Sequence, residues 1–337
     1  MAATMKDIAN YTGLGLATIS KYFNGGNVLE KNKVAIEQAI EKLDFTVNEF
    51  ARGLKTSKSK TVGVIIPELS NIFVTNIITI IEDILRKKGY GVIVCDCRTD
   101  ETLERESVQF LVNKMVDGII NMPVCKDGEH LEPALAKNIP VVLIDRMINN
   151  LKARVDAVVV DNVSASEKAT CHLIENGHQK IGIVIGPREI FTSQQRLLGY
   201  NQAFIKNGLI PDNGLVEYSD YTVQGGYESM KLMLARHSDL TAVFVTNYEM
   251  TLGAIIAINE LGIKLPQELS VIGFDNMQLS QVVKPKLTII TQPLEEIGEQ
   301  VAKVMLSRLL SNGDYQPDII TLSTQLQLGE SVNMPNK

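Results

Sequence analysis

The stretch "TMKDIANYTGLGLATISKYFN" at residues 4–24 decides how the beginning of the chain folds. Its two closely spaced glycines, Gly13 and Gly15, fit either a phosphate-binding loop or the turn of a DNA-reading element. A dinucleotide-binding loop needs a preceding strand and a third glycine three residues after the second. Thr18 stands at that position instead, and the apolar residues before Gly13 recur at helical spacing. The stretch therefore favours a turn between two helices.

Three short helices are predicted near the N-terminus. Thr4 followed by Asp7 is a capping-box pattern, so a helix begins here and runs up to the break at Gly13. Helical character resumes over residues 16–23, where two further glycines end it, and residues 31–43 form a third, amphipathic helix. Helix, glycine-containing turn, helix and supporting helix make the helix-turn-helix arrangement that binds DNA.

Charge is unevenly distributed along the chain. The 337 residues carry 33 Lys+Arg and 39 Asp+Glu, a net charge of -6. Residues 1–60 hold 9 Lys+Arg against 6 Asp+Glu, a net of +3, which leaves 24 against 33, a net of -9, for the remainder. A basic head on an acidic body is typical of a DNA-contacting domain joined to a second module. The polar residues 46–60 between them predict a hinge and linker.

The sequence contains no common catalytic or metal-binding motif. GxSxG, GxxxxGK[ST] and HExxH are all missing, the four histidines are scattered, and the four cysteines lack CxxC spacing. We therefore expect a non-enzyme with no catalytic residue, cofactor or metal site. Cys95 and Cys97 lie two apart at the end of a strand-like run and are expected to be buried or passive thiols. No 18-residue apolar stretch and no leader is found, which predicts a cytoplasmic protein without membrane contact.

After residue 60 the chain alternates apolar, β-rich runs with helical segments. The runs are "VGVII", "YGVIVC", "DGIIN", "PVVLID", "AVVVD", "KIGIVI", "TAVFVT" and "LSVIGFD". Apolar runs that alternate with helices are typical of parallel sheets covered on both faces. The length of this region suits two such lobes, divided near Asp161 after the fifth run.

Polar residues follow several of these runs, namely Asp96, Asp145, Asp161, Asn247 and Asp275. Ligands of doubly wound sheets bind outside the carboxyl ends of the strands, where these residues are expected to lie. An Asp or Asn at such a position also caps the helix that follows. Each residue alone fits a helix cap, whereas the whole set favours a ligand cleft.

These features resemble the LacI/GalR family of bacterial transcription regulators. The similar segments are "TMKDIANYTGLGLATISKYFNG", "NEFARGLK", "VGVIIPELSNIF", "VDGII", "PVVLIDR", "GHQKIGIV", "RLLGY", "GFDN" and "LTIITQP". They follow one another in the family's order over nearly the whole chain, and they are similar to both its catabolite-control and its purine-repressor branches.

The resemblance implies an N-terminal all-α helix-turn-helix head, a hinge helix, and an α/β two-lobed periplasmic-binding-protein-like body of doubly wound parallel sheets. The expected bounds are 1–46 for the DNA-binding domain, 47–60 for the hinge helix and linker, 61–161 with 292–322 for the N-terminal lobe, and 162–291 with 323–337 for the C-terminal lobe. Such a protein is a homodimeric repressor of a carbohydrate operon. It binds a roughly palindromic operator and responds to a small-molecule effector.

The resemblance also implies which residues contact DNA. The base-reading positions fall on Leu16, Ala17 and Lys21, where the two apolar side chains can meet a thymine methyl and the lysine can donate to guanine. Lys21 replaces a frequent Arg, and Gly15 replaces a frequent Ser that touches phosphate. Thr4, Thr18 and Asn24 match phosphate contacts. In the hinge, Ala51 and Leu54 are DNA-binding positions, with Leu54 as the wedge in the minor groove.

The implied effector residues are Phe73, Asp145, Thr192, Arg196, Tyr221, Asn247 and Asp275. Carboxylates, a guanidinium and an amide suit the hydroxyls of a sugar or sugar derivative, and the aromatic rings supply flat walls. Ile190 stands where the purine repressor presents an arginine, and Tyr248 where sugar-responsive relatives commonly have Asp. A nucleobase corepressor, a protein co-regulator, or a solute-binding sensor without a DNA role are the alternatives.

Overall fold

The computed structural model describes residues 3–23, 25–45, 58–151, 153–275, 277–311 and 316–335. The chain divides into two compact units, Met1–Ser59 and Lys60–Lys337. Among the described residues, no helix has the length and apolar character needed to cross a bilayer.

The first unit contains the helices α1 (Met5–Thr12), α2 (Leu16–Phe23) and α3 (Glu30–Lys42), which confirm the three predicted helices to within one residue. The predicted capping box is confirmed, because the Thr4 hydroxyl accepts from the Asp7 amide and the Asp7 carboxylate accepts from the Thr4 amide at 2.8 Å. Gly13 ends α1 with a φ of 69°, a conformation that favours glycine. Ile8, Ile19 and Ile36 form the fully buried core of this unit.

The second unit contains two six-stranded sheets. The first is entirely parallel, and its strands in spatial order are β11 (Ile319–Leu322), β5 (Asp156–Val160), β4 (Val141–Ile144), β3 (Gly118–Asn121), β1 (Thr61–Ile66) and β2 (Gly91–Asp96). One face packs on α5 (Ile72–Lys87) and α13 (Leu294–Leu310), and the other on α6 (Glu101–Asn113) and the short α7 (Glu132–Leu135). Two 3-10 turns, η1 (Glu129–Leu131) and η2 (Asn149–Leu151), complete this lobe.

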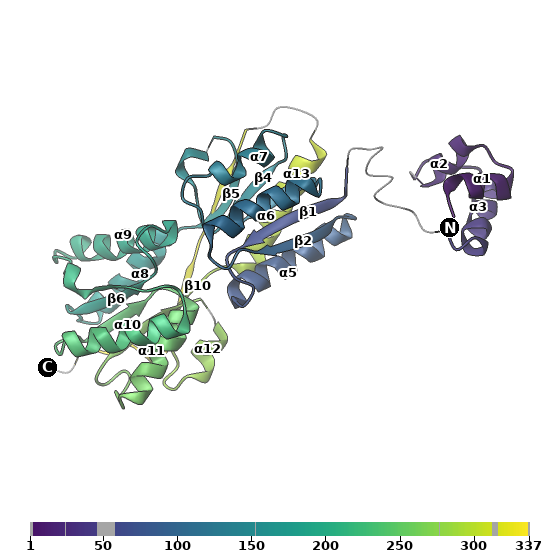
Figure 1. Cartoon of the computed structure of the whole chain (residues 1–337). Helices are drawn as coiled ribbons and strands as arrows, with labels where there is room; N and C mark the ends of the chain where they lie inside the picture. The colour runs from purple at the N-terminus through teal and green to yellow at the C-terminus, as the bar shows by residue number, and fades with distance from the viewer. Residues whose placement is uncertain are drawn as a thin grey trace. The chain divides into compact units, whose positions relative to one another are not determined.

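The second sheet repeats the same plan. Its spatial order is β12 (Gln325–Gln327), β10 (Thr288–Thr291), β9 (Ser270–Phe274), β8 (Ala242–Val245), β6 (Ile181–Ile185) and β7 (Val216–Tyr218), with only β12 antiparallel. Figure 1 shows α8 (Asn162–Glu175) and α9 (Phe191–Lys206) on one side of this sheet, and α10 (Val223–Arg236) and α11 (Tyr248–Glu260) on the other. The turn η3 (Asn213–Leu215) precedes β7, and α12 (Met277–Val282) lies between β9 and β10.

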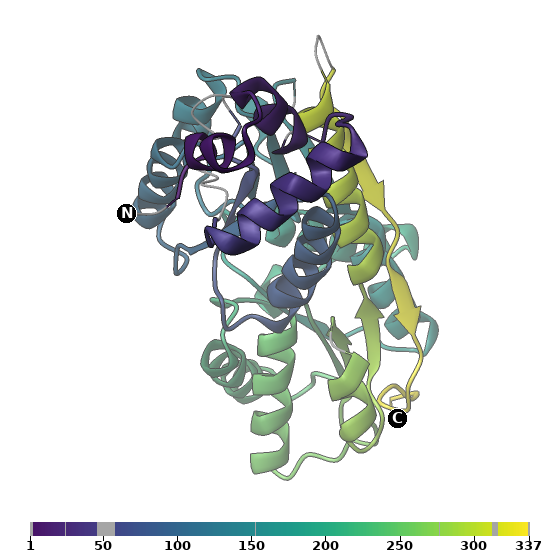
Figure 2. The same ribbon diagram turned by 90° about the vertical axis from the view of Figure 1, so that its right-hand side faces the viewer.

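The chain passes between the two sheets three times, from β5 to α8, from β10 to α13 and from β11 to β12. Figure 2 shows the last of these passages, where the yellow C-terminal strands run one after the other from one lobe into the other. Arg308 near the end of α13 donates to both carboxylate oxygens of the fully buried Asp156 at 2.5 and 2.8 Å, and Asp156 also accepts from the Asp318 amide. This ion pair fastens the late segments α13 and β11 to the first lobe.

Candidate DNA-reading head and effector cleft

The predicted base-reading residues lie together on the exposed side of α2. Leu16 is 52% exposed, and Ala17 and Lys21 are exposed as well, while Ile19 on the same helix is completely buried. Thr18 is half-buried, and the exposed Thr4 already uses its hydroxyl in the cap of α1.

Gly15 has no conformational need to be glycine. Its φ is not in the left-handed region, and a Cβ added there would meet no atom within 4 Å. A serine side chain would therefore fit at position 15, and the structure gives no reason for the glycine found there. Asn24, Ala51 and Leu54 lie outside the described residues.

Four of the five polar residues at the strand ends divide into two kinds. Asp161 and Asn247 cap helices, since their side chains accept from the amides of Ser164 and Met250 at 2.9 Å. Asp145 and Asp275 adopt left-handed conformations with φ of 64° and 69°. Backbone strain of this kind in non-glycine residues clusters at functional sites.

Asp96 belongs with neither kind, because its carboxylate accepts from the Arg98 amide in a turn. Asn247 combines the cap with a second contact, since its amide nitrogen donates to Glu249 at 2.6 Å.

Asp275 holds an unusual charge environment. Burial raises its pKa to about 7 although the charge of Arg196 and a hydrogen bond from Gln292 lower it, and the carboxylates of Asp145 and Glu249 add to the rise. The Gln292 side-chain nitrogen donates to Asp275 at 2.6 Å. These carboxylates are therefore near enough to repel one another.

Arg196 is buried and held in one orientation. Its Nε donates to Asn162 at 2.8 Å, its Nη1 donates to the Thr246 carbonyl, and its guanidinium lies 3.9 Å from the centroid of the Phe274 ring. A guanidinium fixed in this way loses little entropy when it binds a further acceptor.

Two aromatic residues join the same region. Phe73 and Asp145 line one small pocket together with Gln292. The Tyr221 hydroxyl is hydrogen-bonded to the hydroxyls of Thr192 and Ser193 at 2.9 and 2.6 Å, and its ring lies 5.8 Å from the Arg146 guanidinium.

Three residues that the sequence analysis did not include among the effector residues contact members of that set. Gln292 links the pocket of Phe73 and Asp145 to Asp275, and Arg146 lies beside both Asp145 and Tyr221. Glu249 contacts Asn247. Both Arg146 and Gln292 lie inside the segments "PVVLIDR" and "LTIITQP" that carried the resemblance, which was the available signal.

Of the two thiols predicted to be buried or passive, Cys97 is buried and Cys95 is half-buried. Cys97 is fully buried, and burial raises its pKa to about 12, while burial raises the pKa of the half-buried Cys95 too. The expectation based on scattered histidines did not foresee that Glu104, Cys125 and His130 meet in the fold.

Comparisons with known proteins identify the family. A model of the periplasmic binding protein-like domain matches residues 170–332. Catabolite control protein A from Priestia megaterium is 33% identical over 98% of this chain and 99% of its own. The chain belongs to the LacI/GalR family of transcription regulators. A second LacI/GalR relative, the transcriptional repressor PurR from Glaesserella parasuis, is 32% identical over 95% of this chain and 94% of its own.

Solved LacI/GalR structures have the same fold. The transcriptional regulator CelR in complex with cellobiose is 26% identical, covers 98% of this chain and 99% of its own, and has a TM-score of 0.75. The lac repressor dimer bound to operator and an anti-inducer superimposes with a TM-score of 0.87 over 99% of this chain and 100% of its own, at 23% identity. The helical head and the two α/β lobes of this LacI/GalR chain are thereby confirmed.

Proposed function

We propose that this regulator is a cytoplasmic homodimer that represses a carbohydrate operon and is controlled by a sugar bound between its lobes. It acts by binding and not by catalysis. The observation that carries the effector half is the buried Asp275 carboxylate between the charges of Arg196 and Asp145, with left-handed backbones at both aspartates.

In this proposal each part of the chain has one task. Residues 1–46 read the operator, 47–60 form the hinge, 61–161 with 292–322 form the first effector lobe, and 162–291 with 323–337 form the second. Leu16, Ala17 and Lys21 read bases in the major groove, which agrees with their exposure on α2. Ala51 and Leu54 contact DNA in the hinge, and Leu54 of each protomer enters the minor groove at the centre of the operator.

The charges of the cleft favour an uncharged polyol as effector. Asp145, Glu249 and Asp275 contribute three carboxyl groups beside the guanidinium groups of Arg146 and Arg196, and burial raises the pKa of Asp275 and of Glu249, so further negative charge is disfavoured here. Carboxylates accept from neighbouring hydroxyls of a sugar, whereas a phosphate group would meet like charge. CelR, which shares the fold and was solved with cellobiose, supports a saccharide.

The effector is tested by thermal shift with uncharged sugars, sugar acids, sugar phosphates and nucleobases. A ligand at 100 times its dissociation constant stabilises the folded state by about 2.7 kcal/mol, which is readily measured. We expect an uncharged sugar to stabilise the wild type and the control Arg188→Ala, whose side chain is exposed. The same sugar should lose its effect on Arg196→Ala and on the smaller change Asp145→Asn. A nucleobase hit, or a sugar hit unaffected by both variants, would overturn this effector site.

The DNA half is tested by selecting operators from random duplexes with the full chain. Lys21→Ala should weaken binding to the selected operator by about 1–3 kcal/mol, while Lys33→Ala on α3 serves as an exposed control. The effector should then change operator affinity by about 1–3 kcal/mol. Unchanged binding by Lys21→Ala removes the recognition helix from the proposal, and an effector without influence on operator affinity removes the allosteric switch.

A further inference from the structure

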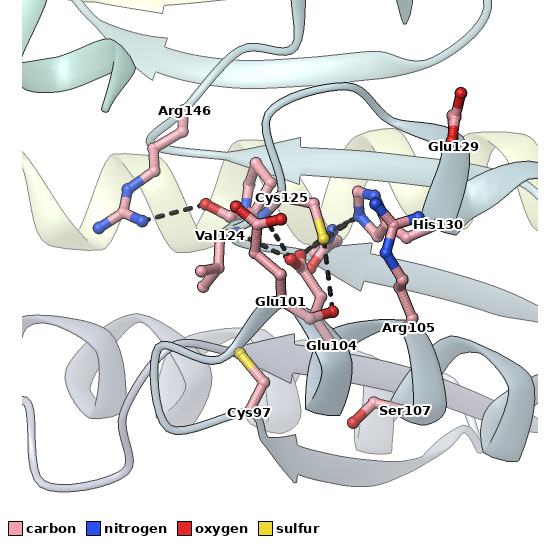
Figure 3. Close-up of polar contacts among 12 residues, drawn as sticks. Cys97, Glu101, Glu104, Arg105, Ser107, Val124, Cys125, Glu129, His130 and Arg146 are labelled. Atoms are coloured by element: carbon pink, nitrogen blue, oxygen red, sulfur yellow. Dashed lines mark hydrogen bonds and ion pairs between the residues drawn. The ribbon is translucent and has the colours of Figure 1, made fainter. Parts of the chain in front are cut away.

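A buried group of chemically reactive side chains lies at the carboxyl end of β3, outside the set that forms the effector cleft. It consists of Glu104 on α6, Asn121 at the end of β3, Cys125 in the following loop and His130 in η1. All four are at most 3% exposed. Figure 3 shows the Cys125 thiol and the His130 ring turned toward the Glu104 carboxylate. The ligand atoms of these three residues lie within 4.8 Å of one another.

Three of the polar atoms are spaced like the ligands of one small cation. The Asn121 side-chain nitrogen Nδ2 is 2.9 Å from Glu104 Oε1 and 3.0 Å from His130 Nε2. Glu104 Oε1 is 3.3 Å from His130 Nε2. Zinc bonds to nitrogen and oxygen of about 2.0–2.2 Å in a tetrahedron separate neighbouring ligand atoms by roughly 3.3–3.6 Å. Only small movements are needed to enclose an ion.

Hydrogen bonding alone leaves this group incomplete. When the Asn121 amide nitrogen donates to both Glu104 and His130, Asn121 Oδ1 and His130 Nδ1 are buried without a partner among the described residues. Unpaired buried polar atoms cost about 1–3 kcal/mol each and are uncommon. Exchanging the nitrogen and oxygen of the Asn121 amide turns Oδ1 toward Glu104 and His130, and when His130 carries its proton on Nδ1, three acceptors face one another. A cation between them removes their repulsion.

We propose that Glu104, Cys125 and His130 bind one zinc ion, with the Asn121 carbonyl oxygen as the fourth ligand. Thiolate and imidazole ligands select zinc and similar transition metals over magnesium and calcium. Cys125 binds as a thiolate and gives its proton to the solvent, so the sulfur–hydrogen bond is replaced by a sulfur–zinc bond. The carboxylate and the thiolate together balance the two charges of the ion, which matters in a site closed to water.

Such an ion would fasten three segments to one another. Glu104 already accepts from the backbone amides of Val124 and Cys125 at 3.0 and 2.6 Å. The same loop carries Pro123, whose carbonyl accepts from Arg146 at 3.0 Å. The zinc would therefore stiffen the loop on which Arg146 rests.

Cobalt(II) added to the metal-free full-length chain is the probe, because it reports both tetrahedral geometry and thiolate ligation by absorbance. We expect d–d bands and a thiolate charge-transfer band that saturate at one equivalent per chain and disappear when zinc is added. Cys125→Ser should lose the charge-transfer band, while Cys171→Ser and Cys97→Ser should keep it. Cys125 is the variant of choice because serine keeps a hydroxyl that can contact the Glu101 carbonyl and the Glu104 carboxylate as the thiol does, whereas Glu104 also supports the backbone.

A second readout is the melting temperature with and without zinc. Zinc should raise the Tm of the wild type and of Cys171→Ser, and leave that of Cys125→Ser unchanged. Absence of both bands at one equivalent in the wild type, or bands that survive in Cys125→Ser, would show that the group is a hydrogen-bonded network and not a metal site.

Discussion

Single side chains at the strand ends perform different tasks that one sequence pattern hides. The side chains of Asp161 and Asn247 accept hydrogen bonds from helix amides. Asp145 and Asp275 have left-handed backbone conformations, and the charge of Asp145 raises the pKa of Asp275. The pattern of Asp or Asn after an apolar run predicts that all are near a sheet edge. It does not distinguish them, because capping depends on backbone angles set by the packing of the following segment.

Asp275→Asn is expected to remove a pH dependence of stability. Burial raises the pKa of Asp275 from 3.8 to about 7, so the folded protein holds this proton more tightly than the unfolded chain. The resulting stability is complete below about pH 4 and is lost as the pH rises toward 7. Because Asp275 keeps partial exposure, we expect a loss on the order of 2 kcal/mol, less than the full shift implies.

Urea unfolding at pH 5 and pH 8 measures this effect. The wild type and the exposed control Glu299→Gln should both become less stable at pH 8, and Asp275→Asn should change much less. An equal decline in all three proteins would mean that another group titrates.

Helices of the second lobe pack in pairs through glycines. A Cβ added at Gly253 on α11 would come within 1.9 Å of the Val223 carbonyl oxygen on α10, and one at Gly199 on α9 within 2.1 Å of the Val163 carbonyl oxygen on α8. Gly199 belongs to the segment "RLLGY" that carried the family resemblance. The close approach itself is a property of two helices together, and helical periodicity in one of them does not reveal it.

Gly253→Ala should therefore destabilise the protein by about 1–3 kcal/mol or more, because the backbone of α10 must move away. Gly91→Ala is the matched control, since nothing lies within 4 Å of the added carbon. Equilibrium unfolding in urea compares the two, and equal midpoints would contradict close helix packing at Gly253.

Strands show where prediction from sequence succeeds and where it ends. All eight apolar runs are confirmed as strands; seven of them are buried in their sheets, whereas β2 is a partly exposed edge strand. The strand runs did not include β7, β11 and β12, which are short, partly exposed and located at sheet edges, nor the short and largely buried β10. An edge strand with solvent on one side needs no continuous apolar run, so hydrophobic pattern alone does not mark it.

At the scale of the whole molecule, the first lobe depends on residues that come late in the sequence. Strand β11 belongs to its sheet, and α13 covers the sheet face on which α5 also packs. Both segments follow the second lobe's first five strands in the sequence. Arg308 and Asp156 hold this late segment in place. The spacing of the motifs predicts two lobes, but the exact partner of Asp156 follows only from the folded backbone.

Arg308→Met should reduce stability by about 3–5 kcal/mol, because it leaves the fully buried Asp156 carboxylate without its cation. The exposed pair of Arg236 and Glu217, at 3.4 Å, provides the control, and Arg236→Met should cost less than about 1 kcal/mol. Hydrogen exchange should speed up in β11 of Arg308→Met alone. Similar losses in both variants would exclude a special role for the buried pair.

The three passages between the sheets also bear on how the protein is made. A ribosome releases the chain from its N-terminus, at about 5–20 residues per second. The first lobe emerges early, yet it lacks an edge strand and a covering helix until α13 and β11 have been synthesised. During that interval the apolar face that α13 covers remains open on the nascent chain. The second lobe also needs β12, which follows β11, so the first lobe is completed only after β11 and the second only after β12 has been synthesised.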